Sequence, residues 1–211
     1  MNNTMTNRVA EPWKESAYYD RVESEKALSA FWANNSIFYQ LFLHLDTTHI
    51  VELACGHGRH VKKYFDNCVS ISLVDINSEN IEFCKNRFSD NKNIEYILTC
   101  GNNFFPIQDA TKTAIFSYDS MVHFEMHDVD GYLNDAYRIL VPDGKILLHH
   151  SNYAANPGGL YSENPGWRNF MSADIFAHLA IRAGFCVISQ TIINWSKNNL
   201  DCISLCQKPS T

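Results

Sequence analysis

Short runs rich in β-branched and aromatic residues alternate with segments of helical periodicity, and this alternation restricts the fold more than any other feature. The runs occupy residues 49–54, 69–75, 94–99, 113–119 and 145–150. Helices are predicted at about 59–67, 78–89, 128–140 and 173–183. Strands that alternate with helices build a parallel sheet with helices on both faces. The sequence therefore predicts an α/β fold.

The two ends of the chain depart from this alternation. Residues 22–45 carry apolar residues at helical spacing and predict an N-terminal helical element, interrupted near Asn34 and Asn35. Two β-rich runs, at 185–193 and 200–208, predict a terminal hairpin.

Three residues mark the expected ends of helices. Ser78 and Ser172 are expected N-caps, and Gly184 is expected to follow the last helix in the position that favours glycine. A chain of 211 residues is expected to form a single domain. Its expected parts are an N-terminal helical cap at 1–47, a ligand-binding core at 48–150, a lid at 151–171, and a C-terminal helix and hairpin at 172–211.

Composition restricts the partners. The chain has 17 basic and 23 acidic residues, and its net charge of −6 gives no attraction to nucleic acid or anionic lipid. No signal peptide or membrane-spanning run is recognised, so we expect a cytoplasmic protein without membrane insertion. The seven cysteines include no C-x-x-C pair, which argues against a zinc site. A small-molecule substrate is expected, and the oligomeric state stays open.

The stretch HIVELACGHGRH predicts a strand that ends at a ligand. Gly56 and Gly58 follow the first strand, where glycines let the backbone approach a bound molecule. Asp75 ends the second strand, 19 residues after Gly56, where a carboxylate can accept the hydroxyl hydrogens of a ribose. Glu52 lies within the first strand and needs a cationic partner, which an ammonium-bearing ligand supplies. The alternative is an ordinary strand-to-helix turn.

A nicotinamide dinucleotide is a weaker candidate for this ligand. Its fingerprint requires a third glycine, and that position holds Val61 in GHGRHV. Arg59 and His60 are interpreted as a solvated helix start, although both side chains suit a phosphate.

Five motifs occur in the order found in one enzyme family: VELACGHGRH, LVD, CGNNFFPI, FSYDSMVHF and ILVPDGKILL. Over about residues 48–207 the sequence resembles the class I S-adenosylmethionine-dependent methyltransferases. The resemblance implies a Rossmann-like, doubly wound, seven-stranded sheet, mostly parallel with an antiparallel C-terminal hairpin strand. It also implies S-adenosylmethionine as cofactor, with Asn102 where the family often has aspartate. The implied cofactor-binding residues are Glu52, Ala54, Gly56, Gly58, Asp75, Ile76, Gly101, Asn102, Asn103, Ser117, Tyr118 and Asp119.

Two histidines are candidates for the general base that an alcohol acceptor needs. His123 follows the fourth strand and His150 closes the fifth, and histidine titrates in the useful range. If the segment from Asp119 were helical, Asp119, His123 and His127 would share one face and suit a metal. No metal is expected, and the histidines are alternatively interpreted as packing groups.

Two flanking segments are predicted to form the side of the site that binds the methyl acceptor. The N-terminal segment supplies Tyr18 and Tyr19, and such segments often fold over the cofactor in this family. The connection 151–171 is long for a compact domain and predicts a lid. Its side chains suit a polyhydroxylated acceptor, and Arg168 suits a phosphate or carboxylate; the candidates are Asn152, Tyr153, Trp167 and Arg168. In both segments these residues could instead pack or shape turns.

The segments HHSNY and NPGWRNFMS are also similar to methyltransferases of bacterial surface-polysaccharide pathways. This similarity favours O-methylation of a sugar or sugar-linked precursor. The alternatives are N-methylation of a small amine, a nicotinamide-dependent oxidoreductase, or a non-catalytic partner that keeps the cofactor pocket.

Overall fold

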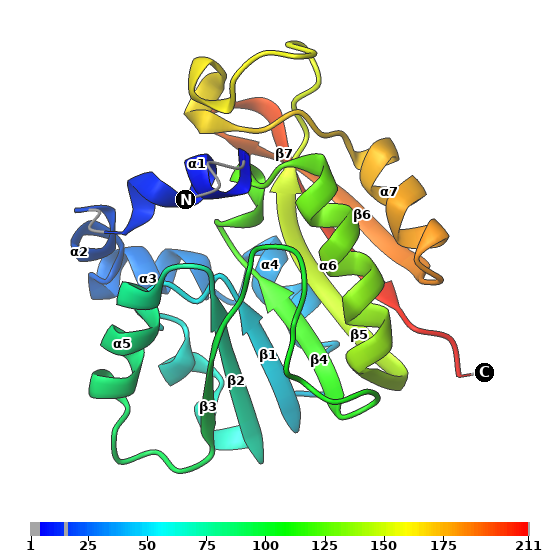
Figure 1. Cartoon of the computed structure of the whole chain (residues 1–211). Coiled ribbons are helices and arrows are strands. Elements are labelled where there is room, and N and C mark those ends of the chain that lie inside the picture. The colour runs from blue at the N-terminus through cyan, green and yellow to red at the C-terminus, as the bar shows by residue number, and fades with distance from the viewer. Residues whose placement is uncertain (1–4, 15–16, 211) are drawn as a thin grey trace.

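One seven-stranded sheet organises the molecule, as the computed structural model shows for residues 5–14 and 17–210 (Figure 1). The strand order is β3-β2-β1-β4-β5-β7-β6. All neighbours from β3 to β5 pair in parallel, and β7 runs antiparallel to both β5 and β6. The predicted Rossmann-like sheet is therefore confirmed. The strands are β1 (His49–Leu53), β2 (Ser70–Asp75), β3 (Ile94–Leu98), β4 (Lys112–Ser117), β5 (Leu140–Ser151), β6 (Cys186–Trp195) and β7 (Lys197–Gln207).

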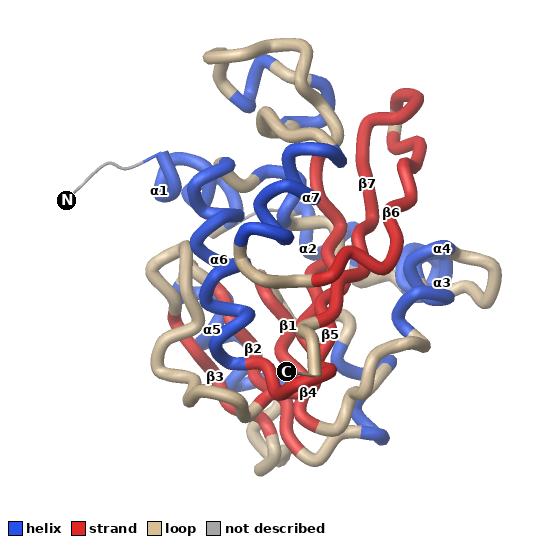
Figure 2. The backbone as a smooth tube through the Cα atoms, turned by 90° about the vertical axis from the view of Figure 1, so that its right-hand side faces the viewer, coloured by secondary structure: helices blue, strands red, loops and turns tan. Residues whose placement is uncertain are grey.

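Helices cover both faces of this sheet, as the two perpendicular views show (Figures 1 and 2). Alternate strand residues point to opposite faces, so Val51 packs with α6 and α7 and Ile50 packs with α3, α4 and α5. The helices are α1 (Met5–Ala10), α2 (Tyr18–Val22), α3 (Glu25–Phe31), α4 (Ile37–Phe42), α5 (Ser78–Arg87), α6 (Met126–Ile139) and α7 (Ala173–Arg182). In the described part of the chain, no helix is long and apolar enough to cross a membrane.

Several predicted element ends agree with the structure. The N-terminal helical element breaks where expected, between the end of α3 at Phe31 and the start of α4 at Ile37. Ser172 caps α7, because its side chain accepts a hydrogen bond from the backbone N–H of Ile175 at 3.1 Å. Gly184 follows α7 with φ of +104°, as its predicted position requires.

Two local predictions are wrong. The expected helix at 59–67 is a pair of short 3₁₀ turns, Val61–Lys63 and Phe65–Asn67. Val61 and Tyr64 are both buried, and the three-residue repeat of a 3₁₀ turn places both on the core side. At α5 the N-cap is Asn77 rather than Ser78, because the extended backbone of Asn77 is held by the strand end before it.

The carboxyl ends of β1, β2 and β4 meet at one edge of the sheet. The N-terminal helices α1 and α2 lie across this edge (Figure 1). Segments that are far apart in the sequence therefore come together above the glycine turn that follows β1.

Candidate functional site

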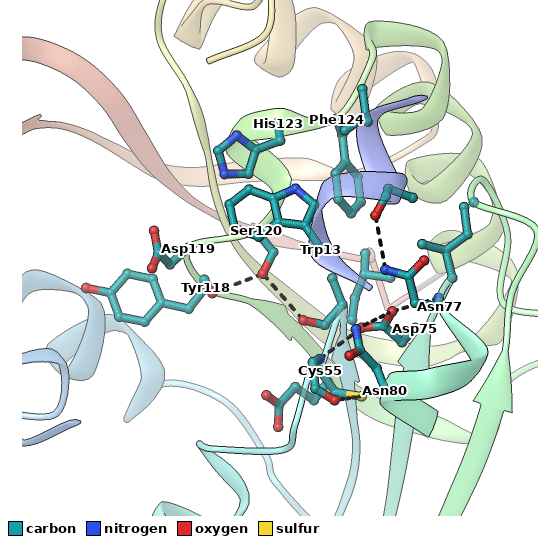
Figure 3. Close-up of a pocket in the computed structure, with 18 of the residues that line it drawn as sticks. Trp13, Cys55, Asp75, Asn77, Asn80, Tyr118, Asp119, Ser120, His123 and Phe124 are labelled. Carbon is teal, nitrogen blue, oxygen red and sulfur yellow. Dashed lines mark hydrogen bonds between the residues drawn. The ribbon is translucent and has the colours of Figure 1, made fainter. Parts of the chain in front are cut away.

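A pocket lies between this sheet edge and the N-terminal helices (Figure 3). The space between its walls is about 990 Å³, including the open space at its mouth. Asp75, Asn77 and Asn80 gather on one side, and Trp13 and His123 face one another on the other side. The sequence-predicted residues that line it are Tyr18, Tyr19, Glu52, Ala54, Gly56, Asp75, Ile76, Gly101, Tyr118, Asp119 and His123.

Asp75 is fixed at the end of β2 by three donors. Its carboxylate accepts hydrogen bonds from the backbone N–H of Gly56 at 2.9 Å, the backbone N–H of Asn77 at 2.9 Å, and the Asn80 side chain at 3.1 Å. Burial raises the pKa of Asp75, and the bonds from Asn77 and Gly56 oppose that rise. A carboxylate has about four acceptor positions, so Asp75 keeps the capacity to accept a ribose hydroxyl.

Glu52 supplies a second acid beneath the pocket. It is 2% exposed, and the Tyr64 hydroxyl donates to it at 2.6 Å. Burial raises the pKa of Glu52 to about 7, which the Tyr64 hydrogen bond opposes. Among the described residues it has no ion-pair partner. A cation in the pocket would therefore stabilise its charged form.

The N-terminal helices close the pocket through two tyrosines. The Tyr19 ring lies against Gly56, where an added Cβ would come within 2.6 Å of the ring, and it stacks on His57 at 4.1 Å. The Tyr19 hydroxyl accepts a hydrogen bond from Asn80 at 3.0 Å, and the Tyr18 hydroxyl donates to Asp119. Gly56, with φ of +53°, therefore suits both its turn and the ring above it.

Asp119 is held in the left-handed region at φ +61° just after β4. Its backbone N–H donates to Nδ1 of His149 at 3.1 Å, and its carboxylate accepts from Nη2 of Arg59 at 3.2 Å. Arg59 is 8% exposed, so its interpretation as part of a solvated helix start is wrong. The reason is that Arg59 lies in the turn before the first 3₁₀ helix, with its side chain directed to Asp119 and the pocket.

His123 has the geometry of a base. A carbonyl oxygen only accepts, so the 2.7 Å contact of Nδ1 with the backbone oxygen of Trp167 places the hydrogen on Nδ1. Nε2 of the neutral ring then carries a lone pair. Burial lowers the pKa of His123 to about 4, and the ring lies 4.9 Å from Trp13 in the pocket wall. His123 is therefore neutral at pH 7 and borders the pocket, but the expectation that it titrates near neutral pH is wrong, because burial disfavours its charged form.

His150 lies outside the pocket and is fully buried. Its Nδ1 donates to the backbone oxygen of Ser151 at 2.8 Å, Nε2 contacts the Ser204 hydroxyl at 2.8 Å, and the ring stacks on Phe176 at 4.0 Å. Burial lowers the pKa of His150 to about 3. Since a base must reach the proton that it removes, this position removes His150 from the candidates.

Arg168 is also buried and paired within the protein. Its Nε and Nη2 donate to the carboxylate of Asp201 at 2.9 and 2.5 Å, and His149 contacts the same carboxylate at 3.0 Å. Arg168 is 4% exposed and does not line the pocket. The prediction that it grips a phosphate or carboxylate is therefore corrected, because Asp201 already supplies its anion.

The other predicted lid residues also lie outside the pocket wall. Asn152 accepts from the backbone N–H at the start of α7 and donates to the backbone oxygen of Asn199. Tyr153 forms a bridge with Phe170. Trp167 is 43% exposed and comes nearest to the pocket, since its ring lies 6.0 Å from Trp13.

Four predicted cofactor residues do not line the pocket. Gly58 backs onto α5, where an added Cβ would come within 2.6 Å of the Phe88 ring. Ser117 is fully buried in β4. Asn102 and Asn103 belong to the loop that begins at Gly101, and the Asn103 side chain accepts from the backbone of that loop.

The structure adds wall residues that the sequence did not indicate as cofactor contacts. Asn77 and Asn80 lie at the start of α5 and flank Asp75. Their positions, two and five residues after the strand-end acid, are the signal that could have identified them. The alternative metal set is not assembled: Met121–His123 is a 3₁₀ turn and α6 begins at Met126, and the described residues contain no His, Cys, Asp and Glu group able to hold a metal.

The part of the chain that holds the glycine turn and Asp75 also matches a known protein family. A family model for the methyltransferase domain matches residues 51–148, from β1 through β5. These residues match a methyltransferase domain, and the ordered motifs within them resemble those of the class I S-adenosylmethionine-dependent methyltransferases. The strand-end acid and the glycine turn fit S-adenosylmethionine, the cofactor that this resemblance implies. A comparison with functionally curated proteins finds no match.

Solved structures resemble nearly the full length of the chain. Geranyl diphosphate C-methyltransferase from Streptomyces coelicolor A3(2), solved with Mg²⁺, geranyl diphosphate and S-adenosylhomocysteine, is 11% identical with a TM-score of 0.71, and 98% of each chain is covered. A methyltransferase from Aquifex aeolicus is 12% identical with a TM-score of 0.66, covering 90% of this chain and 97% of the other.

The [4+2]-cyclase SpnF is 12% identical with a TM-score of 0.66, covering 83% of this chain and 79% of the other. At such identities the likeness shows the fold alone. Because a cyclase shares it, the acceptor and reaction must be argued from the pocket.

Proposed function

We propose that this methyltransferase transfers a methyl group from S-adenosylmethionine to a hydroxyl of a small polar metabolite. The acceptor class that we favour is a sugar or a sugar-linked precursor of a surface polysaccharide. The observation that carries the proposal is His123, a neutral histidine whose hydrogen is on Nδ1 and whose ring borders the pocket.

Each wall residue has a distinct part in this reaction. S-adenosylmethionine supplies, when bound, a methyl group already activated by a positively charged sulfur. Asp75 and Asn80 hold the ribose hydroxyls, and Glu52 attracts the ammonium group. His123 accepts the hydroxyl proton as the new carbon–oxygen bond forms. Alignment of the acceptor oxygen with the methyl group supplies the rest of the rate.

The acceptor side of the pocket is aromatic. Trp13 lies 4.9 Å from His123, 5.5 Å from Tyr18 and 6.0 Å from Trp167, measured between ring centroids. Flat apolar rings beside a base suit the C–H face of a sugar ring, whose hydroxyls then point to its edges. Arg168 and Asn152 form their hydrogen bonds within the protein. We therefore assign the support of a sugar to these aromatic rings in place of Arg168 and Asn152.

A screen for methyl transfer tests the proposal. The protein is incubated with methyl-labelled S-adenosylmethionine and sets of sugar nucleotides, glycans and amines. We expect label in a hydroxylated acceptor. His123→Ala should lower the rate by about 10²- to 10⁴-fold, the usual contribution of a general base, with little change in S-adenosylhomocysteine affinity.

His127→Ala is the matched control, because His127 is exposed at the start of α6. It should leave the rate unchanged. Label in amines alone, together with a rate that His123→Ala does not alter by even tenfold, would replace this proposal by N-methylation. An amine that arrives deprotonated needs alignment but no base.

A further inference from the structure

Arg59 leaves one nitrogen of its guanidinium unused. Nε donates to Nε2 of His60 at 3.1 Å, and Nη2 donates to Asp119 at 3.2 Å. Nη1 is buried and has no hydrogen-bond partner among the residues that the structure describes. A buried donor of a charged group without a partner is strongly unfavourable, and native proteins seldom leave one. The missing partner of Nη1 therefore indicates that a ligand binds there.

The surroundings of Arg59 restrict the chemistry of that ligand. Its Cζ lies 5.6 Å from the Tyr18 ring and 5.0 Å from the Phe31 ring. Burial lowers the pKa of Arg59, but the nearby Tyr18 and Asp119 raise it by more, so the guanidinium stays charged. One anion, Asp119, already occupies one edge of the guanidinium, which disfavours a doubly charged phosphate beside it. A singly charged oxygen group fits best.

We propose that Nη1 of Arg59 binds a carboxylate oxygen of a ligand in this pocket. The carboxylate has two possible sources: the amino-acid end of the S-adenosyl cofactor, or an acidic acceptor such as a uronic acid. The first source rests on the cofactor alone. The second also rests on the proposed function.

Tyr18 is the residue that a carboxylate would have to displace. Its ring covers the guanidinium, and its hydroxyl donates to the same Asp119 carboxylate that pairs with Arg59. When the ring moves aside, Nη1 becomes accessible from the pocket that both residues line. Arg59 and Asp119 remain paired throughout, so the incoming carboxylate replaces the Tyr18 ring over the guanidinium and leaves the ion pair intact.

Calorimetry without any acceptor tests the first source. Three ligands are compared: S-adenosylhomocysteine, its decarboxylated analogue, and 5′-methylthioadenosine, which lacks the whole amino-acid end. Arg59→Gln should weaken S-adenosylhomocysteine by about 10- to 100-fold and leave the other two nearly unchanged. Arg59→Lys keeps the charge without the planar fork and should lie between. Lys63→Gln, an exposed neighbour, should change none of the three affinities.

The acceptor arm uses acids and their amides as acceptors in the transfer assay. A rise in KM confined to carboxylated acceptors in Arg59→Gln, with all three cofactor affinities unchanged, would assign the carboxylate to the acceptor. Equal losses for all three adenosyl ligands would show a structural role and overturn the proposal. So would unchanged affinities in Arg59→Gln together with an unchanged KM for acids. If Arg59→Gln does not fold, Arg59→Lys gives the same comparison.

Discussion

The raised pKa of Glu52 predicts that cofactor affinity rises with pH. Burial places this pKa at about 7, so only about 10% of the carboxyl is charged at pH 6 and about 75% at pH 7.5. If the ligand ammonium pairs with the charged form, S-adenosylhomocysteine should bind about eightfold more tightly at pH 7.5 than at pH 6. Calorimetry across this range, in two buffers of different ionisation enthalpy, measures both the affinity and the proton released.

Glu52→Gln separates this effect from other titrations. It keeps an acceptor for the Tyr64 hydroxyl but cannot become charged. The variant should bind more weakly and lose most of the pH dependence and the proton release. A slope that persists in Glu52→Gln, or no slope in the native protein, would refute the pairing of Glu52 with the ammonium.

The free protein should show the opposite trend in stability. Folding raises the pKa of Glu52 from 4.5 to about 7, so folding favours the protonated form. This contribution is complete below pH 4.5 and is lost as the pH rises through about 7. Urea titrations of the native protein and Glu52→Gln should therefore differ in slope with pH within this window.

The other predictions concern affinity and stability. Asp75→Ala should weaken S-adenosylhomocysteine by about 1–3 kcal/mol, since a hydrogen bond to a charged group is lost, and unchanged affinity by calorimetry would remove Asp75 from the ribose site. Gly58→Ala should lower Tm, because the residue has φ of +70° and no room for a Cβ beside α5. Asp201→Ala leaves buried positive charge unpaired and should cost about 3–5 kcal/mol in urea unfolding, whereas the exposed Asp109→Ala should cost less than about 1 kcal/mol. Replacing 157–166 by a short linker should weaken the acceptor more than the cofactor, since the segment leads into Trp167, whose ring lies 6.0 Å from Trp13 on the acceptor side, and equal losses would show a structural role.

The sheet was predictable from sequence because its signal is local. Strands buried on both faces are continuous apolar runs, and helices between them have a different period. The glycine turn and Asp75 were predictable for the same reason, as both lie at the ends of such runs. The segment 59–67 was not, because its buried apolar residues Val61 and Tyr64 and the charged residues between them fit either a helix or a 3₁₀ turn.

The partners of the buried polar residues were beyond sequence reasoning. From the sequence, His150 was a candidate base and Arg168 a candidate ligand-binding residue. In the structure, His150 contacts Ser204 and Arg168 pairs with Asp201, both on β7. Those partners lie 54 and 33 residues further along the chain and meet them only through the antiparallel pairing of β5 with β7 and the fold of the lid. Arg59 was misjudged for a related reason, since its anion follows β4, 60 residues away.

A comparison of ligands tests whether the pocket beside Asp75 binds an S-adenosyl group. The native protein is titrated by calorimetry and heated with S-adenosylhomocysteine or NAD. We predict one S-adenosylhomocysteine bound per chain and a Tm that rises with its concentration, with no effect of NAD. A folded protein that binds NAD, or that gives neither heat nor a change in Tm with S-adenosylhomocysteine, would show that the pocket is not an S-adenosyl site.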